Sequence, residues 1–297
     1  MYEADDPRSG LAGPVESAGA SAFAPSSYSR FYDTDPGETG KGHRTWYTRG
    51  QNFVVCYAKV EPGATFERIG QPDEYVLLLH EPSLSATVEA NGEVREVPGY
   101  TITMIPPGDS KIVCHSGGQI VRLITTRSAD VVAKASNAAS YRGAHPQVPE
   151  FRPWPTPTGG FKIRSYSLDI PDAPGRFGKL FRCTTFMVNV FPPQGARDVT
   201  KLSPHHHDDF EQGSLALKGW YVHHLRWPWT ANQHDWRGDE HETCGSPSLC
   251  VIPPKVIHTS APSDPHGNVL IDIFSPPRVD FSDMAGWVLN ADDYPRP

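Results

Sequence analysis

The densest group of residues able to bind a metal ion lies between positions 204 and 212, which read Pro-His-His-His-Asp-Asp-Phe-Glu-Gln. In an extended strand, side chains two positions apart point to the same face. His205 and His207 would therefore share one face, and His206 would point to the other. Two imidazoles on one face, followed by a carboxylate or an amide on the next strand, suit a divalent transition metal. His258, which follows a Pro-Pro turn far along the chain, is available as a further imidazole.

Short runs rich in β-branched residues predict the elements that must position these side chains. Turns containing glycine, proline or asparagine close the runs, and the chain holds 26 glycines and 30 prolines, too many for a helical bundle. Strands that follow one another without helical patterns between them predict an all-β sandwich or barrel. One modest helix is predicted at 130–141. The predicted strands lie at 53–60, 74–79, 86–90, 101–105, 111–115, 119–126, 161–168, 179–191, 213–219, 221–227, 248–254 and 269–275.

Composition divides the chain into two strand-rich halves. Residues 1–28 have no apolar period and predict a mobile tail that can be removed with little loss of stability. Residues 144–160 contain five prolines and predict an extended linker. The halves, 29–143 and 161–297, also repeat, because each contains an Ile-Pro-Pro segment downstream of a glutamate or glutamine that opens an apolar strand.

The histidine cluster resembles the first motif of the cupin superfamily, a group of small β-barrel proteins. That motif reads G-x5-H-x-H-x3–4-E-x6-G, and this chain has His205-x-His207-x4-Gln212-x6-Gly219, with glutamine in place of the usual glutamate. The second cupin motif reads G-x5-P-x-G-x2-H-x3-N. Pro253-x-Lys255-x2-His258 fits part of it, with lysine in place of glycine. The resemblance implies two cupin-type (double-stranded β-helix) barrels in tandem.

The resemblance also implies a metal site in the second barrel, with His205, His207, Gln212 and His258 as ligands. Glu211 is the alternative fourth ligand, but it would shift the spacing to the turn glycine. The implied cofactor is one divalent transition metal, and the sequence does not choose among Fe, Mn, Ni, Co and Zn.

The first barrel is expected to have lost its metal and to serve as a structural or dimerisation partner. Aligning Glu74 with Gln212 places Glu67 and Ile69 at the two histidine positions and Lys111 at the position of His258. Two carboxylates and an ammonium group cannot replace three neutral imidazoles around a transition metal.

Three imidazoles and a neutral amide leave a bound ion its full charge, which favours anionic chelating substrates such as enolates, diketonates, catecholates or α-hydroxy acids. Two adjacent open coordination positions suit metal-dependent dioxygenation, our main functional prediction, and equally suit non-redox enolisation. The alternatives are therefore a metal-dependent isomerase, epimerase or lyase, and a non-catalytic small-molecule-binding protein. Tyr221 and His223 are candidate acid–base or orienting groups, and Arg182 is a candidate partner for a substrate carboxylate.

The net charge of −7 and the absence of a basic cluster disfavour nucleic acid as a partner. The apolar runs are far shorter than a membrane span, and no secretory signal is visible. Five scattered cysteines indicate buried thiols in a cytoplasmic protein, and the spacing of Cys244 and Cys250 only weakly suggests a small disulfide loop or a soft metal site. A small-molecule substrate and a homodimer are the expected partners.

Overall fold

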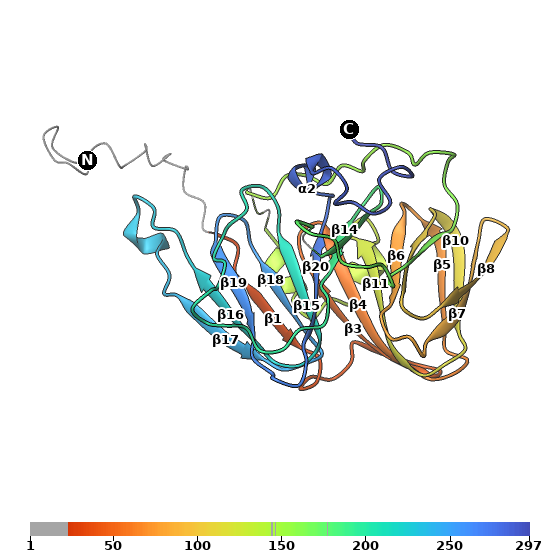
Figure 1. Cartoon of the computed structure of the whole chain (residues 1–297), viewed down its shortest axis with the longest axis horizontal. Coiled ribbons are helices and arrows are strands. Elements are labelled where there is room, and N and C mark those ends of the chain that lie inside the picture. The colour runs from red at the N-terminus through yellow and green to blue at the C-terminus, as the bar shows by residue number, and fades with distance from the viewer. Residues whose placement is uncertain (1–22, 144, 146, 177) are drawn as a thin grey trace, which may run out of the picture.

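The computed structural model describes residues 23–143, 145, 147–176 and 178–297, which form two β-barrels side by side (Figure 1). The all-β prediction is confirmed, because the helices in this described part are all short. None of them is long and apolar enough to cross a membrane. They are α1 (Ala129–Val132), η1 (Ala138–Tyr141), η2 (Gln233–Asp235) and α2 (Val279–Asp283).

The first barrel has a large sheet of order β12-β9-β6-β11-β4-β3-β2 and a small sheet of order β5-β10-β7-β8. Its strands are β2 (Glu38–Gly40), β3 (His43–Arg49), β4 (Phe53–Val60), β5 (Thr65–Gln71), β6 (Tyr75–Leu79), β7 (Ser85–Ala90), β8 (Glu93–Pro98), β9 (Thr101–Ile105), β10 (Gly108–Cys114), β11 (Gly118–Thr125) and β12 (Arg164–Ser167).

The second barrel repeats this plan with a large sheet of order β1-β18-β15-β20-β14-β13 and a small sheet of order β17-β16-β19. Its strands are β1 (Ser27–Arg30), β13 (Lys179–Arg182), β14 (Met187–Val190), β15 (Gln212–Lys218), β16 (Tyr221–Arg226), β17 (Glu240–Cys244), β18 (Ser248–Ile252), β19 (Ile257–Pro262) and β20 (Val269–Phe274).

The apolar runs identified in the sequence are strands in the structure. The run at 53–60 is β4 and the run at 101–105 is β9, while 179–191 is the hairpin of β13 and β14. The predicted helix at 130–141 is two short turns, α1 and η1. The sequence patterns missed the more polar strands, such as β5 and β17, in which most side chains are exposed or only partly buried.

The two halves exchange strands. Strand β1 precedes the first barrel in the chain but pairs with β18 of the second, where Ser27 lies opposite Val251 and Arg30 opposite Ser248. Strand β12 precedes the second barrel but pairs with β9 of the first. Figure 1 shows β1, in red, among the blue and green strands of the second barrel.

The prediction of a mobile tail at 1–28 is wrong for its last six residues, 23–28, which are packed on the second barrel. Phe23 is buried against Trp227 in a small core that also contains Ile252 and Val256, and the Tyr28 hydroxyl donates to Glu240 Oε2 at 2.6 Å. Residues 1–22 lie outside the described residues. The sequence analysis did not predict β1, because its four residues show no apolar alternation. Only the pairing with a distant strand identifies them as a strand.

The proline-rich segment contacts both halves. The Asn52 side chain donates to the carbonyl of Pro149 at 3.1 Å, and the backbone N–H of Trp154 donates to the carbonyl of Thr184 at 2.7 Å. The Trp154 ring is buried and lies under the Arg182 guanidinium. The described part of the segment is therefore packed on the barrels and is not a free spacer.

The largest apolar core lies between the barrels. It takes Val76, Leu78 and Leu123 from the large sheet of the first barrel and Leu215, Ile271 and Ile273 from that of the second, all of them almost fully buried. A second core fills the interior of the first barrel. The two large sheets thus pack face to face, and much of the hydrophobic stabilisation depends on both halves being present.

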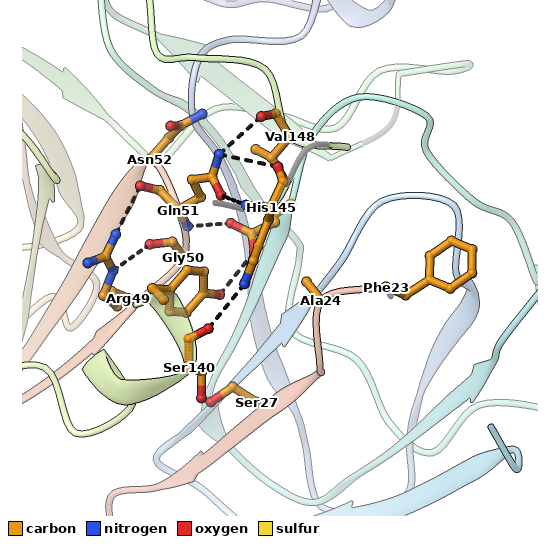
Figure 2. Close-up of polar contacts among 12 residues, drawn as sticks. Phe23, Ala24, Ser27, Arg49, Gly50, Gln51, Asn52, Ser140, His145 and Val148 are labelled. Carbon is orange, nitrogen blue, oxygen red and sulfur yellow. Dashed lines mark hydrogen bonds and ion pairs between the residues drawn. The ribbon is translucent and has the colours of Figure 1, made fainter. Parts of the chain in front are cut away.

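Two buried glutamates join the halves in the same way. Glu74, just before β6, accepts hydrogen bonds from the Thr184 backbone N–H at 3.0 Å and from the Tyr294 hydroxyl at 2.7 Å. Glu211, just before β15, accepts from the Gln51 backbone N–H and from the Tyr141 hydroxyl. Figure 2 shows Gln51 with the neighbouring Arg49 and His145. Burial raises the pKa of Glu74, while the hydrogen bonds from Thr184 and Tyr294 oppose the rise.

Deleting residues 1–30 should lower the free energy of unfolding by about 3 kcal/mol or more, because it removes four paired residues of β1 and uncovers the core around Phe23. Urea denaturation of the truncated chain measures this loss. Deleting residues 1–22 is the matched comparison, and there the sequence predicts little change. Equal stability of the two truncated chains would refute the role given to β1.

Replacing Tyr141 or Tyr294 with phenylalanine should cost about 1.5–3 kcal/mol each, because each change removes a hydrogen bond to a buried carboxylate. Urea denaturation of both single variants and of the double variant should show additive losses. Tyr57→Phe is the control, since its hydroxyl donates to the neutral amide of Gln119 and should cost about 1 kcal/mol. Losses no larger than the control would contradict the role given to these two hydrogen bonds between the halves.

Candidate metal centre

Three histidines converge at one end of the second barrel. The ligand nitrogens of His205, His207 and His258 all lie within 4.8 Å of one another. His205 and His258 face each other through a reciprocal pair of backbone hydrogen bonds of 3.1 and 2.7 Å. His206 is exposed and lies near Asp208. The alternation expected for an extended segment thus brings together the three imidazoles that the sequence singled out.

Hydrogen bonds set which ring nitrogens are available. His258 Nδ1 lies 2.9 Å from the carbonyl of Val256, and His205 Nδ1 lies 2.9 Å from the carbonyl of Ser203. A carbonyl only accepts, so each Nδ1 carries a proton and each Nε2 presents a lone pair. Within the described part of the chain, His258 Nε2 and both ring nitrogens of His207 are buried with no hydrogen-bond partner.

The buried imidazoles are neutral. Burial lowers the pKa of His258 to about 4, and burial also lowers the pKa of His207, helped by the neighbouring His258. Neutral imidazole is the form that binds metal ions. Buried nitrogens without partners carry an energetic cost that a bound cation would remove. The donor set therefore fits a divalent transition ion.

The two sequence motifs meet at a turn. The Lys255 backbone N–H donates to the carbonyl of His207 at 2.5 Å. Lys255 has φ of +66°, the left-handed region where the cupin motif places glycine, so lysine is strained at this position. Gly219, the turn glycine of the first motif, has φ of +87°, and a Cβ there would lie 2.2 Å from Asn268 Oδ1.

Gln212 lines the same cavity as His205 and His258. Its Nε2 donates to Ser214 Oγ at 2.8 Å, and Ser214 Oγ donates to Asp272 Oδ1 at 2.8 Å. Burial raises the pKa of Asp272 to about 7. This chain of contacts fixes the amide nitrogen and leaves Gln212 Oε1 as the atom of the amide that suits a cation.

Glu211 faces the other way. Both of its carboxylate oxygens accept hydrogen bonds from the first half of the chain, and it does not line the cavity. Of the two candidates for the fourth metal ligand, the structure therefore favours Gln212 over Glu211, because successive strand residues point to opposite faces.

The cavity beside the triad has a volume of about 350 Å³. Arg197 is the only arginine or lysine among the described residues that line it, and its Nη2 lies 3.0 Å from Ser203 Oγ. Phe191 and Leu270 give the wall an apolar part, and Ser260 gives it a hydroxyl. The cavity thus combines an imidazole cluster with a single cationic side chain.

Tyr221 and His223 are fully buried in the barrel and do not line this cavity. His223 Nδ1 lies 2.8 Å from Ser260 Oγ, so His223 reaches the cavity through that hydroxyl. Burial lowers the pKa of His223 to about 3 and raises the pKa of Tyr221. Both groups lie behind the wall, where they can orient residues that line the cavity.

Arg182 lies elsewhere, contrary to the expectation that it pairs with a substrate. Its Nε and Nη2 donate to the carbonyl of Tyr294, and its guanidinium lies over the Trp154 ring. It lines a separate cavity near α2. Arg182 therefore fastens the C-terminal segment to the barrel and does not reach the triad cavity.

The first barrel has no imidazole at the equivalent positions, but the sequence alignment was wrong by one residue. Tyr75 pairs with Ile105 and Gln212 pairs with Ile252, and both isoleucines open an Ile-Pro-Pro segment. Tyr75 is therefore the counterpart of Gln212, and Glu74 is the counterpart of Glu211. The Tyr75 hydroxyl lies 2.9 Å from Ser110 Oγ, a buried contact in this barrel. Glu67 and Lys111 form only an exposed ion pair.

Asp272 and Arg197 were missed by the sequence analysis. Asp272 had a usable signal, because it is the only charged residue in the otherwise apolar strand β20. Arg197 lies in an irregular segment between β14 and β15 and gives no pattern. Only the folded chain shows that it lines the cavity.

Neither a family model nor a curated protein matches the sequence. Solved structures match by fold. AerE from Microcystis aeruginosa has a TM-score of 0.55 at 9% identity, over 81% of this chain and 95% of AerE. A variant of oxalate decarboxylase OxdC from Bacillus subtilis has a TM-score of 0.54 at 12% identity, over 88% and 79%. Oxalate decarboxylase from Lactobacillus farciminis has a TM-score of 0.51 at 12% identity, over 84% and 86%. The chain therefore has the fold of a two-barrel cupin.

Proposed function

We propose that the chain is a metal-dependent enzyme that acts on a small chelating organic anion in the cavity of the second barrel. The observation that carries this proposal is the set of buried, unpaired ring nitrogens of His207 and His258 beside His205. Unsatisfied polar atoms are rare in protein interiors, and three imidazoles that share one space call for a cation.

Imidazole ligands with one amide suit Fe, Mn, Ni, Co or Zn as the divalent ion. His205, His207, Gln212 and His258 would hold it. When bound, such an ion supplies a Lewis acid and, for a redox-active metal, one-electron chemistry. An amide in place of a carboxylate leaves more positive charge on the site, which favours an anionic substrate.

The cavity favours a small anion for a second reason. Its volume of about 350 Å³ lies at the lower end of the range for ligand pockets. Arg197 offers a planar donor group for a carboxylate on the side of Ser203. Oxalate, which appears in the names of two of the fold neighbours, is itself a small chelating anion.

Residues around the site would orient the reacting groups. The hydrogen bonds from Gln212 to Ser214 and from Ser214 to Asp272 fix the Gln212 amide. His223, which does not line the cavity, fixes the Ser260 hydroxyl that does. Phe191 and Leu270 would exclude water from part of the cavity. We further propose oxygen insertion as the reaction, with non-redox isomerisation or lysis as the alternative.

Replacing His207 with alanine should reduce the metal content of the purified protein from about one ion per chain to below about 0.2, because it removes one of the two buried imidazoles of the triad. Elemental analysis of protein purified without added metal measures this. His206→Ala is the matched control, since that side chain is exposed and should leave the content unchanged. A His207→Ala variant that kept its metal would rule out the site.

A panel of oxalate, 2-oxo acids, 2-hydroxy acids, diketones and catechols should include a compound that the metal-loaded protein converts with stoichiometric oxygen uptake. An oxygen electrode and product analysis measure this, and Arg197→Ala should raise the KM for a carboxylate substrate about tenfold or more. Turnover without oxygen uptake would replace the dioxygenase by the non-redox alternative. Metal-dependent binding without any turnover would make the protein a binding module.

A further inference from the structure

A second pair of histidines lies on the outer face of the second barrel. His224 on β16 is directly opposite His241 on β17 in the antiparallel register. His224 is half-buried and His241 is exposed. Tyr221, His223 and Leu225 point into the barrel and are fully buried, so His224 points away from them, as the alternation of a strand requires. This pair does not include a triad residue, but the cavity that it lines is also lined by His258 of the triad.

The two imidazoles turn the same ring nitrogen toward each other. His224 Nδ1 and His241 Nδ1 lie 2.7 Å apart, with ring planes inclined at 62°. Two imidazole nitrogens at this distance must share either a proton or a cation, because facing lone pairs repel each other. Two nitrogens bound side by side to one ion, at about 2.0–2.1 Å each, lie about 2.8–3.4 Å apart. A small rotation of either ring would reach that range.

A carboxylate lines the same cavity as the pair. Asp239 lines this cavity of about 160 Å³ together with His224, His241, Thr259 and His258 of the triad. Its Oδ2 accepts hydrogen bonds from Arg226 Nε and Nη2 at 2.9 and 2.8 Å, which leaves Oδ1 for another partner. Arg226 lowers the pKa of Asp239, so the carboxylate is ionised at neutral pH.

We propose that His224 and His241 form a second site, for a divalent transition ion, on the surface of the barrel, with the Asp239 carboxylate in the same cavity. Adjacent strands hold the two imidazoles at a fixed separation, so little conformational entropy is lost on binding. The short nitrogen–nitrogen distance lies nearest the separation in square-planar or tetragonal coordination, which favours copper(II) or nickel(II) over tetrahedral zinc(II).

The site can be tested with copper(II) alone, by calorimetric titration of the full-length His207→Ala variant, in which the inner triad keeps only His205 and His258. One equivalent of copper(II) should still bind, and electron paramagnetic resonance should show two nitrogen ligands. His224→Ala and His241→Ala, each added to that variant, should weaken binding at least tenfold. Asp239→Asn should weaken it several-fold. His234→Ala, which removes an exposed histidine outside the cluster, should have no effect.

Absence of copper binding to the His207→Ala variant, or equal binding after removal of His224 and of His241, would overturn the proposal and leave only a hydrogen bond between the two rings. If His207→Ala fails to fold, the same test applies to the wild-type chain. There His224→Ala should lower the copper stoichiometry from two to one. An unchanged stoichiometry would overturn the proposal. Because the inner triad is tested by His207 and the outer site by His224, either can fail alone.

Discussion

Each barrel of this protein is completed by the other half of the chain. The exchanged strands β1 and β12 extend the two large sheets, and Glu74 and Glu211 each place a buried carboxylate on the opposite half. The glutamates occupy equivalent positions, and each accepts from a backbone N–H in the loop between two paired strands and from a tyrosine near the end of the opposite half. A buried carboxylate without those donors would be strongly destabilising. The halves therefore depend on each other for folding.

This dependence extends to the candidate metal centre. Glu211 precedes Gln212 directly, so the hydrogen bond from Gln51 fixes the first residue of β15 and, with it, the amide that lines the cavity. The first barrel has no triad, yet its loop at Gln51 sets the position of a candidate ligand in the second. Positioning through a rigid neighbour limits the movement of ligands, which favours tight and selective metal binding.

The sequence predicted the features that depend on local pattern. Runs of β-branched residues marked β4 and β9, and the spacing of His205, His207 and His258 identified three imidazoles that do converge. Features that depend on distant partners were missed or misplaced. Strand β1 has no apolar alternation, and its partner is more than 200 residues away in the chain. Arg182 looked free to bind a substrate, but it is held by a carbonyl 112 residues downstream. The one-residue error at Glu74 arose because a one-residue shift exchanges the two faces of a strand, and only the pairing register resolves it.

The two barrels share one backbone plan but differ in the side chains that fill their interiors. In the first barrel, Arg122 on β11 lies between Cys56 and Leu77 on the neighbouring strands, and its guanidinium packs on the Phe66 ring. In the second, Asp272 occupies the equivalent place on β20, between Asn189 and Ser214. Apolar side chains make up most of the first interior, although the buried Arg122 Nε there also has no hydrogen-bond partner among the described residues. The second keeps buried polar atoms without partners, among them Asn189, Tyr221 and His223 within the described residues. Such atoms reduce stability unless water, an ion or a ligand satisfies them. The interior of the first barrel is therefore mainly apolar, and the interior of the second is more polar around Asp272.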